Sequence, residues 1–138
     1  MNMTRSAETR PQIHMIEAEA DALSSLALQV EDRLPQVSAL LIRETARARM
    51  HSAETLPPGV VSMGASVEFV DESTGASRTV QLVYPQQADI SAGRISILTP
   101  VGAGLIGLRE GQSILWPDRD GKERRLVILK VTSPDKQD

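Results

Sequence analysis

The sequence predicts an α+β protein, with an N-terminal antiparallel helical hairpin followed by an antiparallel sheet around one short helix. Three observations lead to this prediction. Apolar residues recur at gaps of three and four before residue 50, which is the period of a helix. Beyond residue 60 apolar and polar residues alternate, which is the period of a strand. Between the predicted strands, Thr99-Pro100 and Gly107 bracket a stretch long enough for one short helix.

The first helix is expected from residue 13 to about residue 30. Its apolar positions form a narrow seam of the kind that packs against one partner helix; they are Ile16, Ala20, Leu23, Ala27 and Val30. A turn follows, and Pro35 can begin a second helix because its missing N–H costs nothing at the first helical position. That helix should reach Met50 or Ser52, and the pair would form a short coiled coil.

Complementary charges support the pairing of these two helices. The first helix starts with acidic residues and the second ends with basic ones, an arrangement that also suits the two helix dipoles. In an antiparallel hairpin, Asp21 would lie near Arg47, and Glu19 would lie near Ala48 and Arg49. The alternative is that residues 13–30 form an ordinary amphipathic helix on a globular surface.

The remaining chain is expected to form one C-terminal domain. Prolines in Leu56-Pro57-Pro58-Gly59 stop the helix and stiffen a linker. Strands are then expected at 65–70, 78–84, 95–98, 113–116 and 124–131, with a turn at 118–121. The predicted organisation is a tail at 1–12, a hairpin at 13–56, a linker at 57–60, a domain at 61–132 and a tail at 133–138.

Charge and composition exclude several classes of function. Of the 138 residues, 41% are apolar and 24% are charged, as in a globular protein. The net charge of −3 argues against direct binding to nucleic acid, which needs clustered Lys and Arg. The chain has no cysteine, no apolar run of membrane-spanning length and no signal-peptide core. We expect a cytoplasmic protein that has no membrane partner.

No catalytic, metal or cofactor site is expected. His14 and His51 lie far apart in the sequence, and neither has a second ligand spaced nearby, which argues against a zinc site. Gly102, Gly104 and Gly107 have the spacing of a dinucleotide-binding loop, but the helix is too short and no second βα unit follows. The simpler interpretation is that these small residues bring the helix close to the sheet. We therefore expect neither a cofactor nor a small-molecule substrate.

The central motif resembles a known family. Thr99-Pro100, the small residues after it, Leu105-Ile106-Gly107 and then Glu110-Gly111 resemble the C-terminal domain of the Gre transcript-cleavage factors. The upstream Val83-Tyr84-Pro85 and Ala88-Asp89-Ile90 extend the resemblance to roughly residues 60–131. Within that family the sequence resembles the branch of regulators of nucleoside diphosphate kinase, which join such a domain to a shortened helical hairpin. The resemblance implies an FKBP-like fold for the C-terminal domain.

The resemblance also implies a partner, which is RNA polymerase. The globular domain of Gre factors anchors on the rim of the polymerase secondary channel through the loop that enters the short helix. The matching positions in this chain are Thr99, Pro100, Val101, Gly102 and Ala103. Pro100 is rigid and would dock at little entropic cost. The alternative, that Thr99-Pro100 is only a capping unit, is compatible with the same geometry.

The tip of the hairpin departs from the family pattern. Gre factors carry there an Asp and a Glu separated by two residues, which help to hold a Mg²⁺ ion that activates water for RNA cleavage. In this chain Glu31 and Asp32 are adjacent, and a helix from residue 13 to residue 32 would span only about 30 Å. Glu31 and Asp32 could equally be a solvated turn.

We therefore expect a non-enzymatic transcription regulator that docks at the secondary channel, competes with Gre factors and does not cleave RNA. An FKBP-like prolyl isomerase or peptide-binding module is the alternative. Because the chain has one Phe, one Tyr and one Trp, the aromatic pocket of such an isomerase would be hard to assemble.

Overall fold

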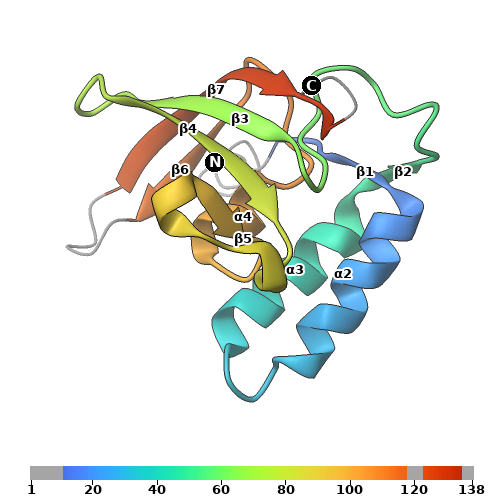
Figure 1. Ribbon diagram of the computed structural model, residues 1–138. Coiled ribbons are helices and arrows are strands. Elements are labelled where there is room, and N and C mark those ends of the chain that lie inside the picture. Colours follow the sequence, from blue (N-terminus) through green and yellow to red (C-terminus); the bar gives the residue numbers. More distant parts are fainter. Residues whose placement is uncertain (1–10, 118–122, 135–138) are drawn as a thin grey trace, which may run out of the picture.

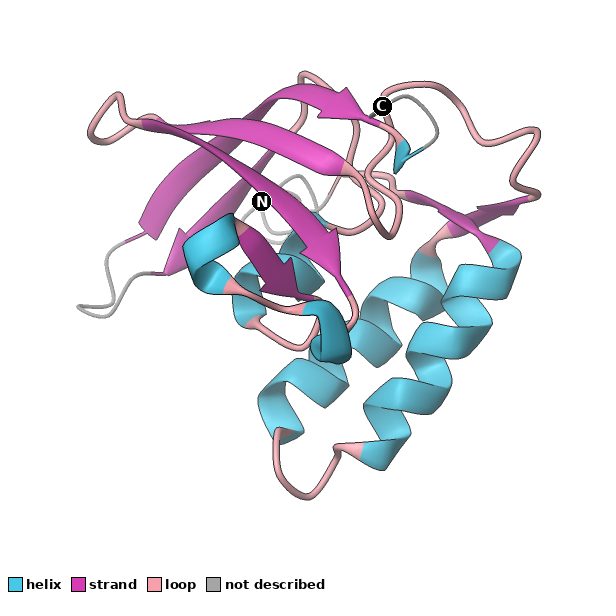
Figure 2. Ribbon diagram, viewed as in Figure 1, coloured by secondary structure: helices cyan, strands magenta, loops and turns pink. Residues whose placement is uncertain are grey.

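Two paired helices pack below a five-stranded sheet in the computed structural model, which describes residues 11–117 and 123–134 (Figure 1). The elements in chain order are β1 (His14–Ile16), α2 (Glu17–Gln29), α3 (Pro35–Arg47), β2 (Arg49–His51), β3 (Ser66–Asp71), β4 (Ser77–Val83), the 3₁₀ helices η1 (Pro85–Gln87) and η2 (Ile90–Ala92), β5 (Arg94–Ser96), α4 (Pro100–Leu105), β6 (Ser113–Pro117) and β7 (Glu123–Thr132). The predicted mixture of helices and a sheet is confirmed (Figure 2). The likeness to FKBP domains stays a prediction.

Small and aliphatic residues hold the hairpin together. Ala20, Leu23 and Ala27 of α2 are buried, as the predicted seam requires, and Val37 and Leu41 of α3 are buried with them. Two hydroxyl contacts add to this packing: the Ser38 Oγ donates to the Ala27 carbonyl over 2.8 Å, and the Ser24 Oγ donates to the Thr45 Oγ1 over 3.1 Å. Each helix has 13 residues, which corresponds to roughly 20 Å. The hairpin is therefore shorter than the sequence predicts.

The base of the hairpin contains a small parallel sheet that the sequence analysis did not predict. Residues 13–16 and 49–51 were expected to be helical, but they form β1 and β2, which pair with His14 opposite Arg49 and Ile16 opposite His51. Ile13 and Met15 are buried. The backbone N–H of His14 donates to the Gly107 carbonyl over 3.1 Å. The prediction of a helix here is wrong because burying Ile13 and Met15 together requires an extended chain, in which alternate side chains share a face.

The charges at the base make contacts that the sequence analysis did not predict. Arg47 binds Glu44 one turn earlier on α3, over 2.8 Å, and donates to the Pro11 carbonyl. Glu19 accepts the backbone N–H of Met63 over 3.1 Å. Neither Asp21 with Arg47 nor Glu19 with Arg49 forms an ion pair among the described residues, and the expected proximity of these side chains stays a prediction. Arg47 has a nearer carboxylate on its own helix, and Glu19 joins the hairpin to the segment before β3.

The main sheet has the strand order β5-β4-β3-β7-β6. All neighbours are antiparallel except β4 and β5, which are parallel, so the prediction of a wholly antiparallel sheet is wrong. The reason lies in the connection between them. Residues 84–93 contain η1 and η2, which carry the chain back so that β5 enters in the direction of β4. The predicted turn at 118–121 lies outside the described residues.

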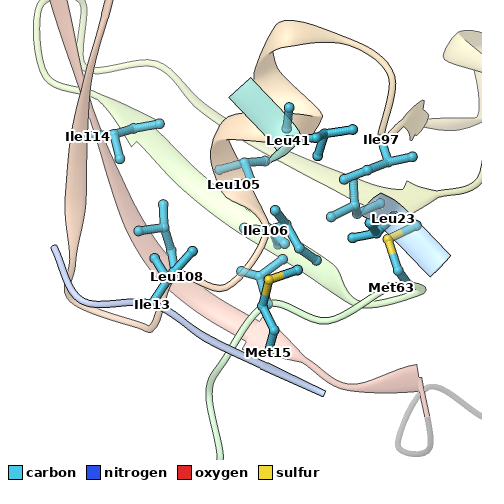
Figure 3. Packing of buried hydrophobic residues seen from close by; sticks show 14 of the residues in the cluster. Ile13, Met15, Leu23, Leu41, Met63, Ile97, Leu105, Ile106, Leu108 and Ile114 are labelled. Carbon is cyan, nitrogen blue, oxygen red and sulfur yellow. The ribbon is translucent and has the colours of Figure 1, made fainter. Parts of the chain in front are cut away.

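One buried cluster connects the sheet, α4 and the hairpin. Figure 3 shows Leu105 and Ile106 in the middle of the cluster, with Leu41 of the hairpin above them and Leu23 to the right, and with Leu108 beside Ile13. Ile13 and Met15 of β1 enter the same cluster. The boundary predicted at residues 57–60 stays a prediction, and the predicted tails fall mostly outside the described residues. No helix in the described part of the chain is long and apolar enough to cross a membrane.

Gly102 allows α4 to lie directly against the sheet. An added Cβ would overlap the Ser96 carbonyl oxygen and would lie 3.1 Å from both the Ile97 Cα and the Leu82 Cδ1. The Ser96 and Ile97 atoms are backbone, so they cannot move aside as a flexible side chain could. This contact agrees with the interpretation that small residues bring the helix close to the sheet.

The first prediction is that Gly102→Ala destabilises the protein by about 1–3 kcal/mol, because a methyl group is forced into a packed site. Helix propensity alone would give the opposite sign, since Ala is favoured over Gly within a helix by about 1 kcal/mol. Urea unfolding of the two proteins measures the difference. A variant more stable than the parent would contradict the close contact.

The second prediction concerns Glu19. Burial raises the pKa of this carboxyl, and the hydrogen bond from the Met63 N–H only partly opposes the increase. The folded state then holds the proton more tightly than the unfolded state, so Glu19 lowers stability as the pH rises from its ordinary pKa through its raised one. Glu19→Gln should remove this loss, and its stability relative to the parent should increase over that pH window.

Urea unfolding at several pH values measures this relative stability. Glu17→Gln, an exposed change on the same helix, is the matched control and should show no such trend. Parallel pH profiles for the parent and Glu19→Gln would contradict the effect of burial.

Candidate functional site

The loop from Ser96 into α4 is held by a closed set of hydrogen bonds. The Thr99 Oγ1 donates to the Ser96 carbonyl over 2.7 Å and accepts the Gly102 N–H over 3.1 Å. The Leu98 N–H donates to the Ser96 Oγ over 2.9 Å. Thr99 is thus the N-cap and Pro100 the first helical residue, as predicted. The loop is rigid before any partner binds.

The predicted contact residues differ in how far they reach the surface. Pro100 is exposed, and Thr99 and Val101 are half-buried. Gly102 and Ala103 are buried under the loop. A partner could therefore touch Pro100 and parts of its two neighbours directly, whereas Gly102 and Ala103 can act only by shaping the loop.

A second projecting segment lies on the connection before β5. Ile90 is 83% exposed, which is unusual for a large aliphatic side chain. Asp89 stabilises this turn, since it accepts the Ser91 Oγ–H over 2.7 Å and pairs with Arg94 over 3.6 Å. An open pocket of about 520 Å³ lies beside it, lined mainly by polar residues; they are Gln81, Val83, Gln86, Gln87, Ala88, Asp89 and Arg94.

The hairpin tip presents two carboxylates on adjacent residues. Glu31 and Asp32 are both exposed, in a turn in which the Arg33 and Leu34 N–H groups donate to the Val30 carbonyl. Leu28, close to this turn, is 60% exposed. No group of three or more possible metal ligands occurs among residues 11–117 and 123–134. Glu31 and Asp32 therefore lie where the sequence placed them, at the far end of the hairpin from β1 and β2 (Figure 1).

The structure brings together the two histidines that the sequence separates. The His14 Nδ1 lies 2.9 Å from the His51 Nε2, although the residues are 37 positions apart. The ring centroids are 5.1 Å apart. Pairing of β1 with β2 makes this contact, so no spacing rule could have found it. The pair lies at the base of the hairpin.

The surroundings of His14 are cationic. Burial, followed by the nearby His51, Arg109 and Arg49, lowers the pKa of His14 below its ordinary value. Arg49 faces His14 across the β1–β2 ladder. Arg109 follows the Gly107 carbonyl to which His14 is bonded. These surroundings thus favour the neutral form of His14.

Comparison with known proteins identifies the family. Residues 56–133 match the family model described as transcription elongation factor, GreA/GreB, C-terminal. The Escherichia coli (strain K12) protein named regulator of nucleoside diphosphate kinase is 35% identical over 123 residues, which cover 89% of this chain and 90% of that protein. The transcription elongation factor GreA of Rhizobium etli (strain CIAT 652) is also 35% identical, over 93% of this chain and 85% of that protein.

A solved structure agrees with these sequence matches. The prokaryotic transcription elongation factor GreA/GreB from Nitrosomonas europaea is 37% identical and superposes with a TM-score of 0.72, covering 89% of this chain and 99% of that one. The match therefore includes the helical hairpin as well as the sheet. The chain belongs to the GreA/GreB family of transcription elongation factors.

Proposed function

We propose that this protein is a non-enzymatic regulator of transcription that docks on RNA polymerase at the rim of the secondary channel. The loop around Pro100 makes the contact, and the hairpin occupies the mouth of the channel. The protein then competes with Gre factors without cleaving RNA. Contact with nucleic acid is indirect, through the polymerase, and the protein acts in the cytoplasm.

The geometry of the loop is the observation that carries this proposal. The hydrogen bonds of Thr99 hold Pro100 at the start of α4, with its ring exposed. A rigid apolar group loses little conformational entropy on binding, so most of its contact energy contributes to affinity. The same loop is the polymerase contact that the family resemblance implies. Ile90 offers a second exposed aliphatic group on a similarly braced turn.

The shape of the hairpin supports occupation of the channel without chemistry in it. Each helix is roughly 20 Å long, and the tip carries adjacent carboxylates in place of the family's spaced Asp and Glu. Glu31 and Asp32 lie in the turn between the two helices, so the spaced carboxylates with which Gre factors help to hold Mg²⁺ have no counterpart at this tip. Leu23 and Leu41 belong to the same buried cluster as the sheet, so the hairpin cannot swing outward without exposing apolar surface.

The alternative of an FKBP-like isomerase has little support. The pocket beside Ile90 is lined by amide, charged and small aliphatic side chains, with no aromatic residue among them. An isomerase pocket needs an apolar, aromatic lining to bind a prolyl ring. We therefore retain one proposed function.

The third prediction tests the docking loop. Pro100→Asp places a charge at the proposed contact but should preserve the fold, because an acidic residue is favourable in the first turn of a helix. Affinity for core RNA polymerase should fall at least about tenfold, equivalent to roughly 1.4 kcal/mol. Pro58→Asp, at another exposed proline, is the control and should bind like the parent. Equal affinities for the parent and a folded Pro100→Asp variant would remove Pro100 from the interface.

The fourth prediction distinguishes occupation of the secondary channel from cleavage of RNA. A backtracked elongation complex given this protein alone should release no cleaved RNA above background, even at saturation. When a Gre factor is present as well, the protein should reduce its cleavage. The double variant Glu31→Ala and Asp32→Ala should compete about as well as the parent, because docking is assigned to the Pro100 loop. Cleavage by the parent that the double variant lacks would show that the tip reaches the catalytic metal.

A further inference from the structure

Four basic side chains gather at the base of the hairpin, and we call His14, His51, Arg49 and Arg109 the basic cluster. The two imidazoles are in contact, with ring nitrogens 2.9 Å apart. Arg49 and Arg109 both act on His14 through their charge, and the segments that carry them, β2 and the residues after Gly107, are both hydrogen-bonded to β1. The cluster thus comes from three chain segments that meet only in the folded protein.

The basic cluster lacks a carboxylate counter-charge within the described part of the chain. Neither Arg49 nor Arg109 forms an ion pair there. Glu110, the neighbour of Arg109, is already engaged, since it accepts the Val131 N–H over 2.7 Å and lies against Gly59. Glu17 after β1 and Glu54 after β2 are exposed and make no ion pair among the described residues. After burial, the groups that lower the pKa of His14 through their charge are His51, Arg109 and Arg49.

The concentration of positive charge in the basic cluster is electrostatically unfavourable. Like charges at short range oppose the protonation of His14, and the two arginines remain charged at any physiological pH. Unpaired charge collected in one place is more typical of a binding site than of a structural network. An anion would offset this repulsion, and it could accept hydrogen bonds from the two guanidinium groups and from His14 Nε2 and His51 Nδ1, the ring nitrogens that are not used in the contact between the imidazoles.

We propose that the basic cluster binds one phosphate group of a small ligand. Two guanidinium groups can each make paired hydrogen bonds to phosphate oxygens, a geometry that suits phosphate particularly well. The imidazoles supply further donors when they are protonated. Four side chains match one oxyanion, whereas a polynucleotide needs a longer track of positive charge and would be repelled by the net charge of −3.

The phosphate group itself, not an attached base, is the part that the site recognises. Phe69, Tyr84 and Trp116 lie on β3, just after β4 and on β6, and none of them lies on β1, on β2 or between α4 and β6. Once the imidazoles and guanidinium groups are engaged by a phosphate, the cluster has no further aromatic side chain on which a base could stack. Inorganic phosphate, pyrophosphate and a nucleoside diphosphate all carry a phosphate group that the cluster can bind. Their relative affinities show which of these ligands the cluster prefers. This inference does not depend on docking to RNA polymerase.

A metal ion is the competing occupant, and the charges argue against it. Ring nitrogens 2.9 Å apart could bracket a metal with bonds of about 2.0–2.1 Å. Two imidazoles would then be its only protein ligands among the described residues, because no group of three exists there. The nearby Arg49 and Arg109 would repel the cation. Titration with Ni²⁺ or Zn²⁺ is therefore included in the test.

The fifth prediction uses the full chain and NMR signals of the two histidine rings. At constant ionic strength, inorganic phosphate and pyrophosphate should shift the ring signals of His14 and His51 in a saturable way. Pyrophosphate and a nucleoside diphosphate should bind with affinities within about threefold of each other, since no base is recognised. Because the bound anion favours the protonated ring, saturation should raise the pKa of His14.

Sulfate separates the protonation of the protein from that of the ligand. It remains a dianion throughout the range in which histidine titrates, so any pH dependence of its affinity comes from the protein. Its affinity should increase at least about threefold between about pH 8 and about pH 6. The double variant His14→Gln and His51→Gln keeps side-chain hydrogen-bonding groups but cannot gain charge, and it should lose most of that increase.

Arginine variants provide the matched comparison. Arg49→Gln and Arg109→Gln should each weaken phosphate binding about tenfold or more, as expected for the loss of a charge-assisted contact. Arg43→Gln, an exposed change of the same charge on α3, should leave it within about twofold. Circular dichroism and thermal unfolding establish that all three variants are folded.

Three results would overturn the proposal. The first is no saturable shift of the histidine signals with phosphate or pyrophosphate at millimolar concentration. The second is an equal loss of affinity for Arg43→Gln and the cluster variants, which would indicate general screening. The third is saturable binding of Ni²⁺ or Zn²⁺ at the histidine pair that phosphate does not weaken, which would assign the pair to a cation.

Discussion

The insertion of β1 between β2 and the segment after α4 is the constraint on which the other parts of the structure depend. Ile13 is fully buried, and an added Cβ at Gly107 would come within 2.9 Å of its Cβ. The His14 N–H and the Ile13 carbonyl bond to opposite sides, to the Gly107 carbonyl and the Arg49 N–H. Gly107 can accept this neighbour because it has no side chain and takes a φ of +86°. The strands that precede and follow the hairpin, β1 and β2, are thereby connected to the segment after α4.

Sequence periodicity predicted the long elements and missed the short ones for a physical reason. The buried seam of α2, the proline at the start of α3 and the Thr99 cap of α4 each depend on residues close together in the sequence. β1 and β2 have three residues each, too few for a period to appear, and they form because distant segments pair. The parallel direction of β5 likewise depends on the path of the connection before it.

The same distinction applies to the candidate sites. Thr99 and Pro100 could be placed from the sequence because a cap and a first-turn proline are local features. The sequence could not show that Gly102 and Ala103 lie beneath the loop, because their burial results from packing of α4 on the sheet. Nor could it show the contact of His14 with His51, which a tertiary strand pairing creates.

The segment from Pro100 to Arg109 connects the two surfaces for which a binding role is proposed. Gly102 fixes the start of α4 against the Ser96 carbonyl and Ile97, and Gly107 fixes the residues after it against Ile13. Pro100 precedes the first of these contacts and Arg109 follows the second. Since both contacts are made by glycines in tight backbone packing, neither end of the segment can shift independently of the core. The core therefore holds the proposed docking loop and the basic cluster at a fixed separation.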